Sequence, residues 1–169
     1  MSDNDTAVPV TIDPAHFRTV LGSYPTGVCV VTGADDNGPA TGMVVGSFTS
    51  VSLDPPLVAF LPDKKSTSWP QIRGCGHFCV NVLAEDQSDL CNRFAKSGGD
   101  KFRDVAHRLS EHGMPVLDNV VAYIECTLEN ELDAGDHTIV LGRVVNLTTE
   151  RDTGPLLFFR GKYGRFEGQ

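Results

Sequence analysis

Short apolar runs rich in β-branched residues recur along the chain, and they constrain its fold more than any other feature. Turn-forming residues bound most of these runs, which lie at residues 27–32, 40–45, 47–53, 57–61, 78–83, 120–132, 138–147 and 155–159. No regular alternation of strand and long helix separates them, so a parallel βαβ sheet is not expected. The sequence predicts a mainly β protein with a closed or partly open antiparallel barrel.

Two or three short helices are expected beside these strands. The first spans residues 13–22, where an Asp-Pro pair fits a helix start and a glycine can end the helix. The second begins at Ser68, which a Trp-Pro pair follows. A third is expected at about residues 86–96, ahead of two glycines, and a turn over residues 34–39 joins the first two strands.

The longest predicted strand, residues 120–132, alternates for a dozen residues. The apolar set is Ile124, Cys126, Leu128 and Leu132, and the opposite set is Tyr123, Glu125, Thr127, Glu129 and Glu131. We expect the apolar set to lie inside the barrel and the opposite set to face water.

The chain is long enough for one packed core, with 169 residues of which 40% are hydrophobic. One domain over residues 1–169 is expected, with its core at about residues 13–165. No apolar run approaches the roughly 20 residues that a membrane helix needs. Residues 1–6 are polar and acidic, unlike a signal peptide. A soluble, cytoplasmic protein with no membrane partner is therefore expected.

Charge and cysteine content exclude further classes. The net charge of −8 disfavours nucleic acid as a partner, because binding phosphate backbones needs clustered Lys and Arg. The five cysteines show no C-x-x-C spacing, and we interpret them as small buried residues. Cys75 and Cys79 flank His77, but no second cluster completes a four-coordinate site, so no metal is expected.

Three nucleotide or catalytic motifs are absent. The segment Gly74-Cys75-Gly76 precedes a predicted strand and lacks the third glycine of the G-x-G-x-x-G dinucleotide fingerprint. Neither the phosphate loop G-x-x-x-x-G-K-S/T nor the nucleophile elbow G-x-S-x-G occurs. Rossmann-type binding, nucleotide hydrolysis and ordinary esterase chemistry lose their main support.

Residues 42–53 combine backbone amides beside small residues with a series of side-chain hydroxyls. The hydroxyls belong to Ser47, Thr49, Ser50 and Ser52. The carbonyl and nitrogen edge of a flavin ring needs such closely approaching donors. A hydroxyl-rich exposed strand face is at least as good an interpretation of this segment alone.

Cations and hydroxyls gather ahead of the second helix, in Lys64-Lys65-Ser66-Thr67-Ser68. This segment is suited to hold a phosphate, and Lys101 is a further candidate cation. The alternatives are a solvated basic turn and a surface lysine beside the buried Phe102.

Two further segments carry candidate ligand contacts. His137 follows Gly135-Asp136 between two predicted strands, where it would project from a tight turn into a cleft, although most loop histidines are simply exposed. Arg160 and Tyr163 follow the last apolar run, where they would clamp and stack on an anionic ligand or form a charged strand end.

Taken together, these segments resemble the flavin reductase family with the FMN-binding split barrel, the small components of two-component flavin monooxygenases. The resemblance covers residues 17–163 and rests on the order and spacing of its motifs. These motifs are residues 25–28 (PTGV), 47–58 (SFTSVSLDPPLV), 66–69 (STSW), 78–83 (FCVNVL), 94–95 (FA), 101–102 (KF), 135–137 (GDH) and 155–163 (PLLFFRGKY).

The resemblance implies an antiparallel split β-barrel with a few short helices, and a set of binding residues. The flavin ring and ribityl chain would lie against Gly46, Ser47, Phe48, Thr49, Ser50, Ser52 and Leu53. The phosphate would lie near Lys65, Ser66, Thr67 and Ser68, with Lys101 and Phe102 closing that side. His137 would contact the nicotinamide dinucleotide, with Arg160 and Tyr163 as weaker candidates, and no obligatory catalytic residue is implied.

The chain departs from the family pattern G-x-T-x-(S/N)-S-F at Val44 and Gly46, where hydroxyl or amide residues are common. Backbone donors survive both changes. By comparison with that pattern, two side-chain hydrogen bonds to the flavin would be lost, each worth on the order of 1 kcal/mol.

The implied activity is NAD(P)H:flavin oxidoreduction, in which NADH or NADPH reduces free FMN or FAD for a partner flavin-dependent monooxygenase. A homodimer is expected, with the strand at residues 120–132 as a candidate contact. An oxidase or oxygenase of the same fold that retains its flavin is the alternative enzyme. A non-catalytic flavin-binding module is the alternative from another class.

Overall fold

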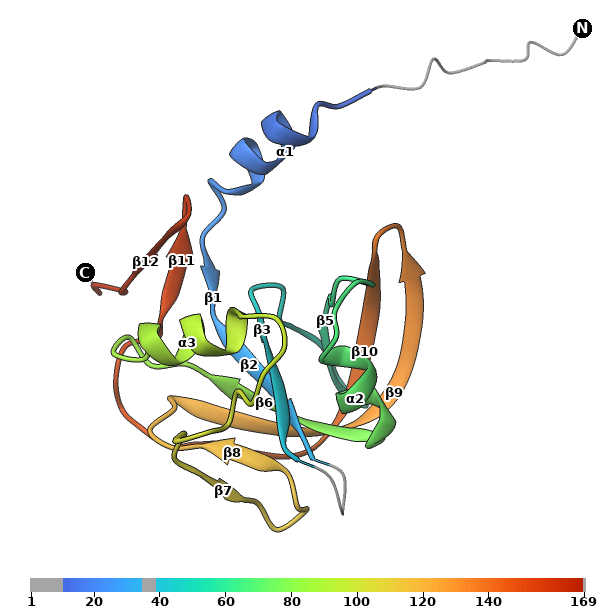
Figure 1. Cartoon of the computed structure of the whole chain (residues 1–169), viewed down its shortest axis with the longest axis vertical. Coiled ribbons are helices and arrows are strands. Elements are labelled where there is room, and N and C mark those ends of the chain that lie inside the picture. Colours follow the sequence, from blue (N-terminus) through green and yellow to red (C-terminus); the bar gives the residue numbers. More distant parts are fainter. Residues whose placement is uncertain (1–10, 35–38, 169) are drawn as a thin grey trace, which may run out of the picture.

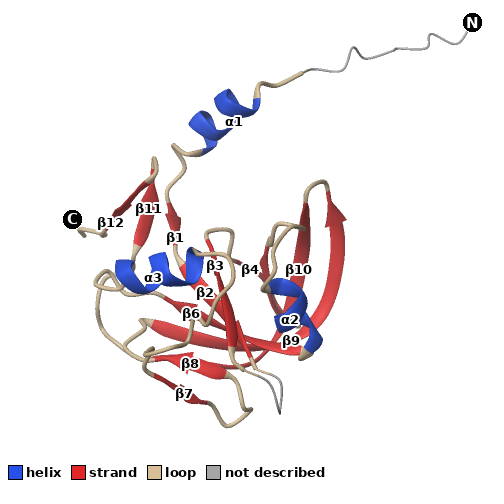
Figure 2. Cartoon of the chain, in the orientation of Figure 1, coloured by secondary structure: helices blue, strands red, loops and turns tan. Residues whose placement is uncertain are grey.

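The computed structural model describes residues 11–34 and 39–168, so residues 1–6 and most of the turn predicted over 34–39 lie outside the described residues. Strand is the main regular structure of the described chain, which also has three short helices. Figure 2 colours the two kinds of element. The helices are α1 (Pro14–Leu21), α2 (Trp69–Gly74) and α3 (Ser88–Ala95). Asp13 caps α1 as predicted, because its carboxylate accepts a hydrogen bond from His16 N at 2.7 Å.

A seven-stranded antiparallel sheet forms the body of the protein (Figure 1). Its strands, in spatial order, are β3 (Thr41–Val45), β2 (Cys29–Gly33), β6 (His77–Val82), β9 (Ala122–Ala134), β10 (His137–Thr149), β5 (Pro56–Phe60) and β4 (Thr49–Leu53). β3 and β4 are the two edges, although they follow each other in the chain. The barrel is therefore split between these two strands, and the loop 46–48 crosses the opening.

Smaller strands complete the fold. β1 (Thr26–Gly27), β11 (Leu157–Phe159) and β12 (Lys162–Gly164) form a three-stranded sheet, and β7 (His107–Leu109) pairs with β8 (Pro115–Leu117). Each of the eight predicted strands has a counterpart among the described strands, which confirms the mainly β, antiparallel prediction. The pairs β7–β8 and β11–β12 include elements that the sequence pattern did not predict.

One apolar core fills the inside of the curled sheet. Val45 on one edge strand and Phe60 beside the other edge belong to the same buried cluster, which requires the sheet to curl around it. Phe60, Trp69 and Phe78 meet edge to face, with ring centroids 5.2–6.2 Å apart. Trp69 reaches this cluster from α2, so that helix closes one side of the core.

Two outer layers cover the other face of the sheet. α3 contributes Cys91 and Phe94 to a second buried cluster with Val28 and Val30 around β2. A side chain at Gly42 would place its Cβ 2.7 Å from the Phe94 ring, so the glycine lets α3 approach β3 closely. The hairpin β7–β8 covers a third cluster.

The predicted faces of the strand at 120–132 need two corrections. Glu125 was expected to face water, but it is fully buried, because the hairpin β7–β8 covers the outer face of β9 at this point. Leu132 was expected inside, but it is 47% exposed, because the end of the β9–β10 hairpin extends beyond the core. Alternation thus separates the two faces correctly but does not tell which segments are covered.

Four of the five cysteines, Cys29, Cys79, Cys91 and Cys126, are buried free thiols as predicted, and Cys75 is partly exposed. Burial raises the pKa of the Cys29 thiol to about 12. Over residues 11–34 and 39–168, no group of His, Cys, Asp and Glu side chains is arranged to hold a metal ion. No helix in that part of the chain is long and apolar enough to cross a bilayer.

Candidate functional site

The loop 46–48, at the split of the barrel, is tied to the chain that follows β5. Ser47 Oγ accepts a hydrogen bond from Leu61 N at 2.9 Å. Phe48 packs against the central core, and this contact anchors the loop to the inside of the barrel. A Cβ at Gly46 would lie 3.1 Å from Thr26 Oγ1, so only a small residue fits between this loop and β1.

The strand β4 presents an open edge beside this loop. β4 pairs with β5 on one side only, so backbone N–H and C=O groups on its other side have no strand partner in the sheet. A β-bulge lies at Val51, between the pairs Ser50–Val58 and Ser52–Leu57. Leu53 is 96% exposed at the end of the strand. This edge combines free backbone donors, hydroxyl groups and an apolar side chain.

A cavity of about 150 Å³ lies next to the segment 65–68. Its lining residues come from four separate parts of the chain and are Met43, Val44, Lys65, Ser66, Thr67, Ser68, Phe94, Ala95, Lys96, Ser97 and Lys101. Three of these residues are lysines and four carry hydroxyl groups. The structure thus places the predicted phosphate-binding segment and Lys101 around one small cavity.

Ser66 and Ser68 have different roles from those that the sequence pattern indicates. Ser68 occupies the N-cap position of α2, but its side chain makes no capping hydrogen bond. Ser66 Oγ instead accepts a hydrogen bond from Trp69 N at 3.2 Å. Ser68 is only 6% exposed, and its Oγ accepts a hydrogen bond from Lys101 Nζ at 3.1 Å.

Lys101 is held by the protein at all three of its ammonium protons. Besides Ser68 Oγ, its Nζ lies 3.0 Å from Gly42 O and 3.0 Å from Phe94 O. These acceptors belong to β3, the start of α2 and the last turn of α3. Desolvation by burial lowers the pKa of Lys101. The next residue, Phe102, is buried, and its ring packs on Phe94 with centroids 5.1 Å apart.

The β9–β10 turn is docked on the segment that leads into the cavity. His137 pairs with Asp63 in an isolated β-bridge, and Thr138 N donates to Pro62 O at 3.0 Å. Lys64 Nζ donates to Gly135 O at 2.6 Å and forms an ion pair with Asp133. These contacts bring the predicted dinucleotide-contacting turn beside Lys65.

His137 is oriented by the residue before it. Its Nδ1 lies 2.7 Å from Asp136 Oδ1, and the imidazole is partly exposed. The hydrogen bond from His137 is the main cause that lowers the pKa of Asp136, and the charge of Lys65 contributes. Gly135 has a φ of 64°, a conformation that glycine adopts without strain and that the tight turn requires.

Arg160 and Tyr163 lie on the β11–β12 hairpin, away from the β9–β10 turn in Figure 1. The Arg160 guanidinium lies 3.3 Å from Ser23 Oγ and lines a separate cavity of about 560 Å³ beside α1. The Tyr163 hydroxyl donates to Asn92 Oδ1 at 2.9 Å and contacts Cys91 Sγ at 3.1 Å. The hydrogen bond with Cys91 and burial raise the pKa of Tyr163 to about 12.

The structure therefore joins three of the predicted segments through direct contacts. Ser47 is bonded to Leu61, and the chain from Leu61 leads through Asp63, which pairs with His137, to the cavity at 65–68. Sequence reasoning did not single out Lys96 and Ser97, which reach the same cavity from the end of α3. The only local signal for them was the predicted helix end before Gly98 and Gly99.

Comparison with protein families and known proteins finds flavin reductases in each case. The model of the flavin reductase like domain matches residues 21–167. A flavin reductase of Pseudomonas putida is 57% identical over 155 residues, covering 92% of this chain and 91% of that protein. The reductase subunit HsaB of a flavin-dependent monooxygenase from Rhodococcus jostii is 47% identical over 156 residues, covering 92% and 80%.

Solved structures share the fold. The NADH:FAD oxidoreductase SgcE6 of Streptomyces globisporus, in complex with NAD and FAD fragments, superposes with a TM-score of 0.86 at 36% identity. The match covers 94% of this chain and 98% of that protein.

Proposed function

Because the chain belongs to the flavin reductase like domain family, we propose that it uses NADH to reduce free FMN or FAD and supplies the reduced flavin to a flavin-dependent monooxygenase. The partner follows the HsaB relative, which is named as the reductase subunit of such a monooxygenase. NADH follows SgcE6, which is named as an NADH:FAD oxidoreductase.

The observation that carries this proposal is the contact path joining Ser47, the cavity at 65–68 and His137. A flavin mononucleotide has a flat ring with a polar edge, a chain of hydroxyls and a phosphate. The open edge of β4 offers donors for the ring, and the lysine- and serine-lined cavity suits the phosphate. The residues present therefore fit a flavin.

We assign the flavin ring and ribityl chain to Gly46 and the residues that follow it. These residues are Ser47, Phe48, Thr49, Ser50, Ser52 and Leu53. The partly buried Phe48 holds the loop in place, and backbone amides of the open edge would stabilise charge that develops on the ring. The phosphate is assigned to the cavity lined by Lys65, Ser66, Thr67 and Ser68, with Lys101 and Phe102 supporting its wall.

A bound flavin supplies the chemistry by accepting a hydride from the nicotinamide, so the chain needs no acid, base or nucleophile of its own. The protein then positions the two ligands. His137, oriented by Asp136, is proposed to contact the dinucleotide from the β9–β10 turn. Arg160 and Tyr163, on the other hairpin, are proposed as weaker contacts of the same ligand.

We also propose a single-domain homodimer in the cytoplasm. α1 has no buried residue, and its apolar side chains Phe17, Val20 and Leu21 are each more than half exposed. A helix of eight residues is marginal in water unless another surface covers its apolar face, and a second copy would supply that surface. The four buried free thiols, Cys29, Cys79, Cys91 and Cys126, agree with a reducing compartment.

The test is NADH oxidation by the purified protein, with and without added FMN or FAD. Turnover that depends on free flavin is the expected result, and its flavin dependence identifies the preferred substrate. Flavin that copurifies tightly and is not exchanged would point to the alternative oxidase. Tight flavin binding without any NADH oxidation would contradict a reductase and leave the binding module.

A further inference from the structure

Lys101 has no proton left for a ligand. A lysine ammonium carries three N–H donors, and in Lys101 they meet Gly42 O, Ser68 Oγ and Phe94 O at 3.0–3.1 Å. Two of these acceptors are backbone carbonyls, Gly42 O and Phe94 O, which would lose this donor if the ammonium turned to a ligand. Lys101 therefore links β3, α3 and the start of α2 and holds the cavity wall in place.

The hydrogen bond from Lys101 also fixes the direction of the Ser68 hydroxyl. Ser68 Oγ accepts from an ammonium, so its own proton must point elsewhere. Ser68 is 6% exposed and lines the cavity, and its hydroxyl proton has no acceptor within the part of the chain that the structure describes. A buried hydroxyl whose proton has no acceptor can donate a hydrogen bond to a ligand atom inside the cavity.

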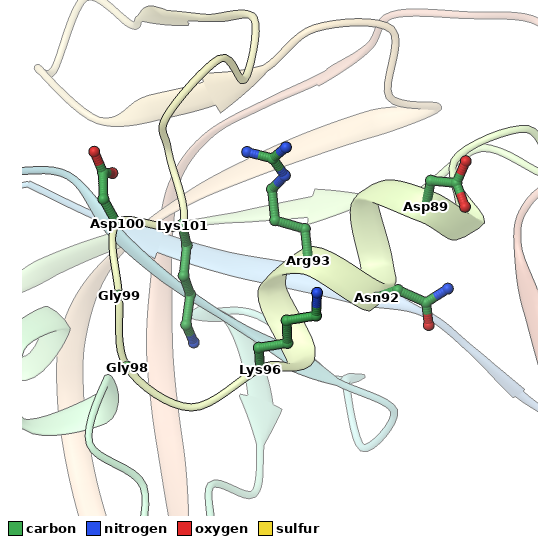
Figure 3. A pocket seen from close by; sticks show the side chains of 8 residues that line it. All are labelled: Asp89, Asn92, Arg93, Lys96, Gly98, Gly99, Asp100 and Lys101. Carbon is green, nitrogen blue, oxygen red and sulfur yellow. The ribbon is translucent and has the colours of Figure 1, made fainter.

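The other lysines near the cavity differ in how they are engaged. Lys64 is bound to Gly135 O and Asp133, and Lys65 interacts with Asp136. The Lys96 ammonium makes no hydrogen bond or ion pair with any described residue. Lys96 lines this cavity and also an adjoining cavity of about 500 Å³, where Figure 3 shows it beside Arg93, with the Gly98–Gly99 loop leading from it to Lys101.

We propose that Lys96 and the Ser68 hydroxyl bind the flavin phosphate, and that Lys101 is a positioning residue that acts through Ser68 and the cavity wall. This inference rests on the proposed function, because it specifies which residues of the proposed flavin site recognise the phosphate. It also replaces the family-derived role of Lys101 as a closing contact with a structural one.

The test compares the binding of FMN and riboflavin, which differ only in the phosphate, by quenching of flavin fluorescence. Lys96→Met is expected to weaken FMN about ten-fold and to leave riboflavin within about two-fold of wild type, because a charge-assisted hydrogen bond is lost. The salt dependence of FMN binding should decrease in the same variant. Lys96 is exposed, so this variant should fold normally.

Lys101→Met provides the contrast. It should lower the melting temperature and weaken FMN and riboflavin alike, so that the ratio of the two affinities stays within about two-fold of wild type. Ser68→Ala leaves Lys101 in place and should weaken FMN a few-fold more than riboflavin. The matched control is Arg103→Met, which removes a 75% exposed cation two residues from Lys101 and should change neither affinity.

Full FMN affinity in Lys96→Met, or equal binding of FMN and riboflavin by the wild type, would overturn the assignment. A selective loss of FMN binding in a folded Lys101→Met variant would overturn it as well. NADH oxidation is followed in the same preparations. A wild type that binds FMN more tightly than riboflavin but oxidises no NADH would reject the reductase proposal while Lys96 could still be assessed.

Discussion

The imidazole Nδ1 of His112 lies 3.1 Å from Oε2 of Glu125, whose side chain is fully buried beneath the hairpin β7–β8. Asn146 Nδ2 donates to the same oxygen at 2.8 Å from β10. The second carboxylate oxygen, Oε1, has no hydrogen-bond partner among the described residues. A single buried carboxylate thus joins the outer hairpin to the two longest strands of the barrel.

Replacing Glu125 by Gln should destabilise the protein by about 1–3 kcal/mol, because charge-assisted hydrogen bonds from His112 and Asn146 are weakened in a buried site. Urea unfolding at neutral pH measures the change. Glu129→Gln on the same strand is the control, since its ion pair with Arg143 lies at the surface. Equal losses in the two variants would contradict a special role for Glu125.

The pH dependence of stability should reveal the same carboxylate. Burial raises the pKa of Glu125, but hydrogen bonds from Ser110, Asn146 and His112 outweigh it and hold the pKa below its ordinary value. A lowered folded-state pKa adds stability above the unfolded pKa of about 4.3, and this stability is lost as the pH falls through the folded pKa. The difference between wild type and Glu125→Gln should therefore be full at neutral pH and shrink in acid. A difference that grows in acid would contradict this sign.

The strands of the main sheet were predictable because each has its own pattern of apolar residues along the chain. The sequence did not show which strand faces other elements cover. Alternation in β9 separates Glu125 from Cys126, and both are nevertheless buried. The outer cover is the hairpin β7–β8, whose strands have three residues each and are too short for a periodic pattern. Burial of Glu125 thus depends on the hairpin β7–β8 folding back over β9, which brings His112, 13 residues earlier in the chain, onto its carboxylate.

The candidate site shows the same limit. The predicted segment 65–68 does line a cavity, because neighbouring residues along one turn stay together. Lys96 joins them only because Phe94 packs on Gly42 and places the end of α3 at the cavity. Similarly, the engagement of all three protons of Lys101 depends on acceptors from three elements. Residue type predicted a cation at the cavity, but only the fold determines which lysine has N–H donors that no protein acceptor already binds.

Gly142 should tolerate no larger residue. An added Cβ would lie 2.5 Å from Cζ of the buried Phe78 and 3.0 Å from Cβ of Cys126, in the middle of the core. Gly142→Ala should therefore cost about 1–3 kcal/mol of unfolding free energy through overpacking. Gly74→Ala is the matched control, because nothing lies within 4 Å of its added Cβ. Thermal denaturation of the two variants compares them directly, and a neutral Gly142→Ala would refute the tight packing.

His137→Ala should raise the KM for NADH about three- to ten-fold and leave the KM for flavin nearly unchanged, because one proposed hydrogen bond to the dinucleotide is lost. Asp136→Asn should have a smaller effect in the same direction, since Asp136 orients the imidazole through its 2.7 Å contact. Steady-state kinetics with each substrate varied in turn separates the two constants. Equal increases in both would argue against the place assigned to His137.

The proposed dimer makes a prediction about α1. Leu21 is 52% exposed at the end of this helix, next to the exposed Phe17 and Val20. Leu21→Asp would place a charge in a surface that a second copy is proposed to cover, at a cost of several kcal/mol on association. Sedimentation velocity at micromolar concentration should show a dimer for the wild type and a monomer for this variant.

Leu109→Asp is the matched control for the dimer, because Leu109 is 63% exposed on β7, far from α1 in Figure 1. This variant should sediment as the wild type does, since the same change of charge falls outside the proposed contact. If both variants remain dimeric, the second copy binds another surface and α1 does not form the contact. If the wild type itself sediments as a monomer, the homodimer is rejected.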